Sequence, residues 1–449
     1  MMAQIKTLVN SLEYVDLNNT PSFLTATTFS MATADVTNFE VGRRVKLFDA
    51  NTMYGTIISV SATQVQVRLD YHTAQSALTA QLSSVAMAVV KSTNNSLPDN
   101  VWKRKNVIIN GSMDIWQRSA SFQPVNNAAT YTADRWVLEL STGGALAVNR
   151  SERSANASNV PTLAQSGVFF NNALLISCSA VDAAVAAGEF VILETKIEGY
   201  DWRQIAHKPM NLSFWVNTRQ SGIYAVALRN SGINRSFVQN YTISAIATWT
   251  KVSIPIPEAP TAGTWDYSTG AGLRVAFVLE AGATYQGGAG NWTAANLLAT
   301  ASQVNFLGSA GNTFAITGVQ LEEGQFATPL EICPYKQELE MCKRYCQTFT
   351  DPARIEGHTI ATNRGLYPYQ LEPEMRTTPT AAYPSALTMV QTDNLAGAAY
   401  VSTAALLSPG KNSLVFDMIC AGTPFTAGVN SHFLISAGSG GSIILDAEL

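Results

Sequence analysis

Short segments in which apolar and polar residues alternate recur along most of the chain. In MNLSFWVNT (residues 210–218), Leu212, Phe214 and Val216 fall on one face of an extended strand, and the residues between them fall on the other. Similar segments follow one another at intervals of about 10 to 15 residues, with almost no helical periodicity between them. This pattern predicts a mainly β chain of packed sheets. It argues against an α/β enzyme fold, in which helices alternate with strands.

Composition divides the chain into blocks. Residues 1–97 are predicted to form a small N-terminal β domain, in which YGTIISVSATQVQVRLD (residues 54–70) has the pattern of a hairpin. The Ser-, Asn- and Pro-rich stretch STNNSLPDN (residues 92–100) is typical of segments between domains, and residues 98–106 are predicted to be the linker. The blocks that follow are a central jelly-roll β-sandwich (107–335), a connecting helix (336–350) and a C-terminal β-sandwich-like domain (351–449).

The single predicted helix lies in YKQELEMCKRYCQTF (residues 335–349). Leu339, Cys342, Cys346 and Phe349 recur there at helical spacing. Cys342 and Cys346 are four residues apart, a spacing that can bind a metal, with Cys333 nearby. Zinc requires four ligands, however, and no histidine is near in sequence. We therefore interpret these cysteines as small buried side chains.

The low charge of the chain excludes several classes of protein. Charged residues make up 13% of the 449 residues, about half the usual share, and the net charge is −4. No contiguous basic run is present, so nucleic-acid binding is not expected. No apolar run is long enough to span a membrane, since the best candidate, residues 173–193, is interrupted by Asp182 and Glu189. No secretory signal is visible either, and we expect synthesis in a cytoplasm without membrane insertion.

The sequence contains few patterns typical of catalytic sites. The sequence has no Gly-x-Ser-x-Gly elbow, and its Gly-rich stretches lack the lysine and the strand-to-helix setting of a phosphate loop. A pair of carboxylates for glycoside hydrolysis is the remaining option. For each candidate, an ion pair or a turn is the favoured interpretation, and the chain is predicted not to be an enzyme. These candidates are Asp114, Asp134, Glu322, Glu323 and Glu331.

Aromatic residues are concentrated in the loop-rich part of the central block, where Trp249 precedes four further rings. Aromatic rings stack well on the apolar face of a sugar, and loops at the end of a sandwich are a frequent place for such contacts. Packing in the core or between subunits is the alternative interpretation. The predicted glycan-contact residues are Trp265, Tyr267, Tyr285 and Trp292.

Six fragments, taken in order, resemble a module found in tailed-bacteriophage tail fibres and receptor-binding proteins. They are INGSMDIWQR, YTADRWVL, LSFWVNT, TWTKVSIPIP, GVQLEEGQFATPLE and ELEMCKRYCQTF, between residues 109 and 349. The β-rich segment before them and the stretches MRTTPTA and LDAEL after them are also similar to the same group.

The resemblance implies a jelly-roll sandwich related to carbohydrate-binding modules, displayed on a virion fibre that is commonly trimeric. It implies no enzymatic activity and no cofactor, apart from a possible structural calcium where the opening strand meets the final one. Asp114 and Glu322 would lie at that edge, with Gly111 and Gly324 in the adjoining turns.

The stretch NVIINGSMDIWQR (residues 106–118) is interpreted as the opening strand of the central sandwich. Ile109 is expected to face the core, Asn110 and Gly111 to form a turn, and Trp116 to be buried. Arg118 is expected to pair with a carboxylate such as Asp134. The other residues of the structural motif are Asp114, Arg135, Trp136 and Glu322.

Together these observations favour a short trimeric tail fibre that binds a host cell-surface glycan. Its N-terminal domain would contact other virion proteins, and lysis would release the particle that carries it. A head fibre, adaptor or decoration protein without receptor binding is the alternative. A glycan depolymerase has the least support.

Overall fold

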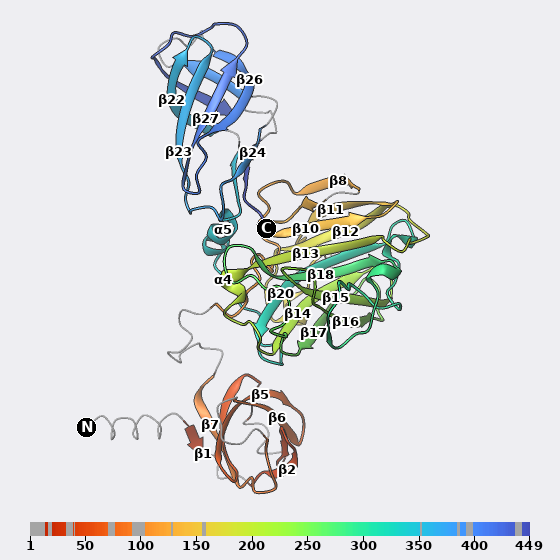
Figure 1. Ribbon diagram of the computed structural model, residues 1–449. Helices are drawn as coiled ribbons and strands as arrows, with labels where there is room; N and C mark the ends of the chain where they lie inside the picture. The colour runs from red at the N-terminus through yellow and green to blue at the C-terminus, as the bar shows by residue number, and fades with distance from the viewer. Residues whose placement is uncertain are drawn as a thin grey trace, which may run out of the picture. The chain divides into compact units, whose positions relative to one another are not determined.

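The computed structural model describes residues 14–16, 20–32, 39, 41–70, 77–91, 104–126, 129–154, 159–350, 353–383, 387–391, 398–435 and 442–449 (Figure 1). The chain divides into two compact units, Met1–Arg104 and Lys105–Leu449. The predicted mainly β class is confirmed. The finer domain boundaries remain predictions, and most of the predicted linker 98–106 lies outside the described residues.

The first unit is one antiparallel sheet with the strand order β1-β7-β4-β5-β6-β3-β2. The predicted hairpin is present, since β5 and β6 pair across a short turn. Alternation along these strands buries one side-chain face, on which Phe29, Val45, Leu47 and Val67 are fully buried. The strands are β1 (Tyr14–Asp16), β2 (Ser22–Thr25), β3 (Thr28–Ser30), β4 (Arg43–Phe48), β5 (Thr52–Val60), β6 (Gln64–Leu69) and β7 (Ser84–Lys91).

The second unit contains a β-sandwich whose first sheet has the strand order β19-β16-β15-β18-β13-β10-β9. Its strands are β9 (Thr130–Tyr131), β10 (Trp136–Ser141), β13 (Phe190–Glu198), β15 (Gly222–Asn230), β16 (Ser236–Ile243), β18 (Ala271–Ala281) and β19 (Trp292–Thr293). The second sheet has the order β17-β14-β20-β12-β11-β8. Its strands are β8 (Ser121–Val125), β11 (Ala145–Glu152), β12 (Asn172–Ala180), β14 (Met210–Thr218), β17 (Thr250–Ile256) and β20 (Thr313–Glu323).

The two sheets pack face to face around one core, and the chain passes repeatedly between them, as in a jelly roll (Figure 1). The predicted apolar face of β14 is present, because Leu212, Phe214 and Val216 are fully buried in this core. On the other face Trp215 and Asn217 are partly buried, whereas Ser213 is buried as well, so burial alternates only in the second half of the strand. Burial of each such apolar side chain contributes about 1.5 to 3 kcal/mol of hydrophobic stabilisation.

The part after the sandwich was predicted to be sandwich-like, and the structure corrects this. Six strands close into a barrel in the order β22-β23-β27-β26-β25-β28, because β28 pairs with both β25 and β22. A separate three-stranded sheet, β21-β29-β24, is built from one strand before the barrel, one between β23 and β25, and one after β28. These strands are β21 (Cys346–Thr350), β22 (Ala353–Ala361), β23 (Arg364–Gln370), β24 (Thr380–Ala382), β25 (Leu387–Gln391), β26 (Ala398–Leu407), β27 (Ser413–Cys420), β28 (Asn430–Ile435) and β29 (Ser442–Asp446).

The predicted connecting helix is shorter than expected. Helix α5 (Tyr335–Lys343) ends before Cys346, where strand β21 begins. Pairing of β21 with β29 supplies tertiary hydrogen bonds that outweigh the helical spacing of the side chains. Two one-turn helices, α3 (Leu163–Ser166) and α4 (Gly199–Trp202), were not predicted. Among the described residues, no helix is long and apolar enough to cross a membrane.

Candidate functional site

An aromatic cluster lies at the end of the sandwich where β13 ends and β18 begins. Trp202, fully buried at the end of α4, stacks on Trp265 with ring centroids 5.2 Å apart and planes inclined by 19°. Trp292 on β19 meets Trp265 edge-on, with centroids 5.8 Å apart. His207 lies beside Trp265, and its Nε2 is 2.7 Å from the hydroxyl of Tyr267. We call these five residues the aromatic cluster.

The loop that carries Trp265 and Tyr267 is held by its own polar side chains. A carboxylate oxygen of Asp266 accepts hydrogen bonds from the main-chain N–H groups of Ser268 (2.7 Å) and Gly270 (3.3 Å). The amide of Asn230 donates to the carbonyl of Thr264 at 2.8 Å, which ties the loop to the end of β15. These contacts hold the loop in place through its own polar groups and through the end of β15.

Exposure in the aromatic cluster is graded from the core outward. Trp202 is fully buried, Trp265 and Trp292 are half-buried, and Tyr267 is 42% exposed. The indole N–H of Trp265 donates to the carbonyl of Ala262, and that of Trp292 donates to the carbonyl of Pro257. The rings are thus fixed by packing and hydrogen bonds, while part of their surface remains open to solvent.

The structure brings together three of the four predicted glycan-contact residues. Tyr285 lies elsewhere, because it follows the far end of β18, where its ring packs edge-on against Phe190 with centroids 5.2 Å apart. Trp249 precedes these rings in the sequence, but its side chain is buried, with an exposed fraction of 5%. Trp202 and His207 were not predicted from the sequence, because neither lies in the loop-rich stretch that contains Trp265, Tyr267 and Trp292.

The segment interpreted as the opening strand contains no strand. Residues 106–118 run beside β20 as an irregular segment, in which Val107 N–H donates to the carbonyl of Leu321 and Val319 N–H to that of Gly111. A side chain at Gly111 would place its Cβ 2.1 Å from the carbonyl oxygen of Val319, so only glycine fits this approach.

Asn110 explains why this segment turns. Its backbone has a φ of 57°, and its side-chain amide donates to the carbonyls of Ile115 and Asp134, while its oxygen accepts from Ile115 N–H. Asparagine suits this left-handed position because a short polar side chain can hydrogen-bond locally. Ile109 packs against α5 residues and Ile115 instead of the main core, and Trp116 is only partly buried against that core.

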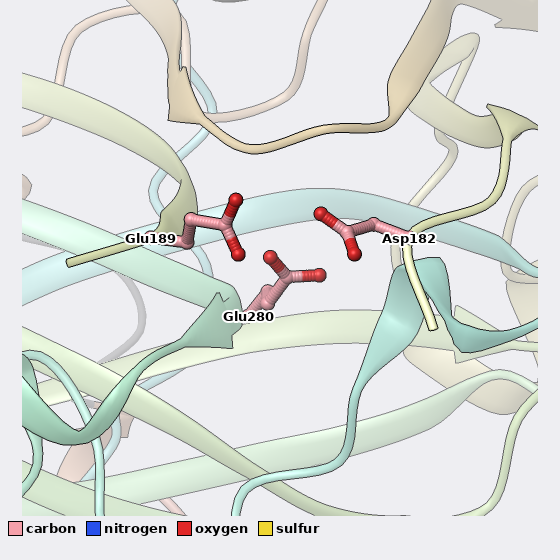
Figure 2. A group of neighbouring side chains, drawn as sticks. All are labelled: Asp182, Glu189 and Glu280. Carbon is pink, nitrogen blue, oxygen red and sulfur yellow. The ribbon is translucent and has the colours of Figure 1, made fainter. Parts of the chain in front are cut away.

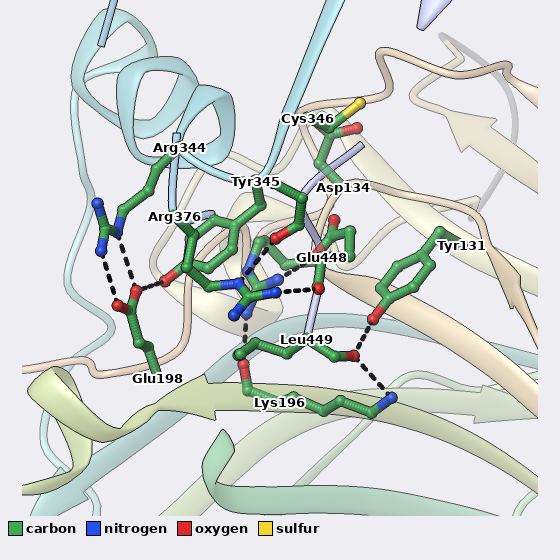
Figure 3. Close-up of polar contacts among 12 residues, drawn as sticks. Tyr131, Asp134, Lys196, Glu198, Arg344, Tyr345, Cys346, Arg376, Glu448 and Leu449 are labelled. Carbon is green, nitrogen blue, oxygen red and sulfur yellow. Dashed lines mark hydrogen bonds and ion pairs between the residues drawn. The ribbon is translucent and has the colours of Figure 1, made fainter. Parts of the chain in front are cut away.

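Two of the predicted structural-motif residues, Arg118 and Arg135, bind the segment 446–449. Figure 3 shows the polar contacts around Glu448 and Leu449 in this segment. Glu448 forms an ion pair with Arg135, and both side chains are 3% exposed or less. Arg118 pairs with Asp446 at 2.8 Å and Glu448 at 3.3 Å, and its expected partner Asp134 is more distant, at 4.0 Å. The guanidinium of Arg135 also lies 3.5 Å from the ring centroid of Tyr345.

The remaining motif residues serve the fold. Trp136 is fully buried in the sandwich core, where its indole N–H donates to the carbonyl of Asn110. Asp134 accepts from the main-chain N–H of Gln117 at 2.9 Å, and burial raises the pKa of its carboxyl despite this bond. Cys342 and Cys346 are fully buried, as their interpretation as small core side chains requires, and burial raises the pKa of both thiols.

The calcium site considered at Asp114 and Glu322 does not form. Asp114 accepts a hydrogen bond from Asn172, whereas Glu322 accepts from the N–H and hydroxyl of Thr328 and lies 3.7 Å from the ammonium of Lys105. Within the described part of the chain, these two carboxylates do not belong to a common metal-binding group.

A concave surface lies on the barrel formed by β22, β23 and β25–β28. It is an open hollow of about 560 Å³, and its lining contains no aromatic side chain. This hollow therefore lacks the stacking surface that the aromatic cluster offers. It is lined by Glu356, Gly357, His358, Pro368, Gly428 and Asn430.

The fold and the site define a mainly β protein with a half-exposed aromatic cluster at one end of its sandwich. No protein-family model matches the chain, and no curated protein matches its sequence. Among solved structures, the enzymatically active domain of tailspike protein 4 from bacteriophage CBA120 is 13% identical with a TM-score of 0.26, and the match covers 49% of this chain and 21% of that one.

Two carbohydrate-binding domains show a comparable similarity. The family 11 module of Clostridium thermocellum, solved with a mixed-linked tetrasaccharide, is 12% identical with a TM-score of 0.24, and the match covers 46% of this chain and 99% of that one. The N-terminal cellulose-binding domain of glucanase C from Cellulomonas fimi is 12% identical with a TM-score of 0.22, and the match covers 43% and 90%. Similarity this distant carries no conclusion about a ligand or a reaction.

Proposed function

We propose that this chain is a carbohydrate-binding structural component of a bacteriophage virion, and that it acts as a short trimeric tail fibre. The single observation that carries the binding function is the aromatic cluster. It offers half-buried rings on a loop held by hydrogen bonds, with the His207 and Asp266 side chains nearby for polar contacts. Sugar-binding sites combine such stacking faces with a few placed polar groups.

The virion role is supported by the six ordered motif fragments that resemble tail-fibre modules. In this proposal the first unit attaches to other virion proteins, and the sandwich presents the aromatic cluster to the host surface as part of a tail appendage that is released by lysis. The depolymerase alternative is weaker, because Asp134, Glu322 and Glu331 hold main-chain N–H groups of the fold.

Substitution in the aromatic cluster tests the binding function. Full-length protein is applied to an array of bacterial surface polysaccharides, and the affinity for any bound glycan is then measured for Trp265→Ala and Tyr267→Ala. Each variant is expected to bind at least about tenfold more weakly, because central aromatic contacts in an interface are worth about 2 kcal/mol or more.

Tyr400→Ala is the matched control, because Tyr400 is 76% exposed on barrel strand β26. It is expected to leave glycan affinity unchanged. Unaltered binding by both cluster variants, or the absence of any bound glycan, contradicts the proposed site. Immunogold labelling of the particle tests the virion role separately, and labels away from the tail favour a head fibre, adaptor or decoration protein.

A further inference from the structure

Three carboxylates converge at the end of the sandwich opposite the aromatic cluster (Figure 2). Asp182 lies in the loop after β12, Glu189 directly precedes β13, and Glu280 lies near the end of β18. One oxygen atom of each lies within 4.8 Å of the others, and no other such group of acidic, histidine or cysteine side chains occurs among the described residues.

Of the three carboxylates, Glu280 has the most unusual surroundings. Its side chain is fully buried, and no hydrogen bond of ordinary geometry reaches either carboxylate oxygen from a described residue. The hydroxyl of Thr142 lies near enough to favour the charged form of Glu280, but it donates its hydrogen bond to Asp182 at 2.7 Å. Figure 2 shows its carboxylate turned toward those of Asp182 and Glu189. A buried carboxylate without a partner costs several kcal/mol, which is why such groups are ordinarily paired or bound to a metal.

The protein neutralises another buried carboxylate of the same sheet with its own cations. Glu194 on β13 is also fully buried, and it pairs with Arg229 at 2.6 Å and Arg274 at 3.0 Å. No ion pair recorded between described residues includes Asp182, Glu189 or Glu280. In contrast to Glu194, Glu280 receives no cationic side chain from the described residues.

The other two carboxylates are held in position at the opening of the site. Asp182 accepts hydrogen bonds from the hydroxyl of Thr142 at 2.7 Å and the N–H of Gly143 at 2.8 Å, which lower its pKa. Glu189 accepts a hydrogen bond from the N–H of Ala186. Both side chains are half-buried, so water can reach the space between the three carboxylates.

We propose that Asp182, Glu189 and Glu280 bind a divalent cation, with Ca²⁺ as the ion that fits best. Calcium takes six to eight oxygen ligands at 2.3–2.6 Å, so that ligands on opposite sides lie about 5 Å apart. The observed spread of the three carboxylate oxygens fits this span. Water at the open side completes the coordination.

Bound calcium would join three segments that are distant in sequence. It links the β12–β13 loop, the start of β13 and the end of β18. Strand β13 separates this site from Trp202 by nine strand residues, or about 30 Å. The cation would therefore stabilise this end of the sandwich without touching the aromatic cluster, and the inference does not depend on glycan binding.

Protons compete with calcium for carboxylate ligands, so the calcium affinity of the site should depend on pH. Ligands must be deprotonated to bind a metal, so calcium affinity is expected to be higher at pH 8 than at pH 6.

The test uses the full chain after removal of metals with a chelator. Calorimetric titration with CaCl₂ at pH 8 is expected to show one bound ion per chain, and saturating Ca²⁺ is expected to raise Tm by several degrees. Glu280→Gln keeps the side-chain shape and removes the buried charge. It is expected to fold, to have a chelated Tm at least equal to that of the wild type, and to lose at least tenfold in Ca²⁺ affinity.

Two further variants separate this site from other carboxylates. Glu152→Gln alters an exposed ion pair on β11, and Glu322→Gln alters the carboxylate beside Lys105. Both are expected to retain the calcium response of the wild type. No calcium heat with the wild type, or an equal response from Glu280→Gln, overturns the proposal.

Discussion

Two buried glutamates in one sheet show how strongly the surroundings of a residue decide its charge state. Strands β13 and β18 pair directly, and Glu194 and Glu280 are both fully buried on them. Burial opposes the charged form of Glu194, but Arg229 and Arg274 outweigh it and lower its pKa. Among the described residues no such cation pairs with Glu280, and burial raises its pKa.

Glu194 is expected to make the protein sensitive to acid. A carboxyl whose pKa is depressed in the fold contributes stability above its unfolded pKa, near 4.5, and this contribution is lost as the pH falls through the folded pKa. The thermal unfolding midpoint of Glu194→Gln should lie well below that of the wild type at pH 7, since buried cations lose their partner at a cost of about 3 to 5 kcal/mol.

The difference between Glu194→Gln and wild type should shrink when both are unfolded thermally at decreasing pH, below about pH 4.5. The exposed-pair variant Glu152→Gln should differ little from wild type at any pH, because its side chain is 63% exposed. If the difference in thermal unfolding midpoint between Glu194→Gln and wild type stays constant as the pH is lowered, the charge of Glu194 does not stabilise the fold.

At the scale of elements, the segment 446–449 joins the three-stranded sheet to the sandwich. It begins at the last residue of β29, and Glu448 forms ion pairs with both Arg135 and Arg118. The main-chain oxygen of Leu449 accepts hydrogen bonds from Tyr131 (2.7 Å) and Lys196 (3.0 Å). Side chains from the sandwich thus hold this segment at both of its ends.

Glu448→Gln is expected to loosen this attachment. Removing the charge leaves two arginines, each 8% exposed or less, without their shared carboxylate, and the expected loss is about 3 to 5 kcal/mol of unfolding free energy. Denaturant unfolding of the full chain measures this loss of unfolding free energy. Glu356→Gln breaks an exposed pair with Arg354 and should cost less than about 1 kcal/mol. Equal effects of the two substitutions would contradict the role given to Glu448.

At the scale of the whole molecule, the proposed tail fibre is expected to be a trimer. Three copies of a weak site on one rigid assembly bind by effective concentration, without any single tight contact. The 13% of charged residues agrees with extensive contact between chains, because few charges would need to be desolvated. Light scattering of the full chain at micromolar concentration should give three times the mass of one chain, and a monomeric mass would contradict this prediction.

The sequence by itself determined the class of structure. Strand alternation is a local property with a period of two residues, so Leu212, Phe214 and Val216 could be placed on a buried face from the sequence alone. Local patterns failed where tertiary hydrogen bonds competed with them. Cys346 fits the helical spacing in the sequence but is the first residue of strand β21 in the structure. The stretch around Gly111 lies beside β20 but has no regular strand structure.

Only the tertiary structure decided which distant residues share a site. Trp202 lies next to Trp265, and Tyr285 lies apart from both, because the register of β13 and β18 sets which loops meet at each end of the sheet. In the sequence, Asp182 and Glu189 only interrupt an apolar stretch. Their approach to Glu280 depends on strand pairing across more than 90 residues of chain, and no local pattern encodes it.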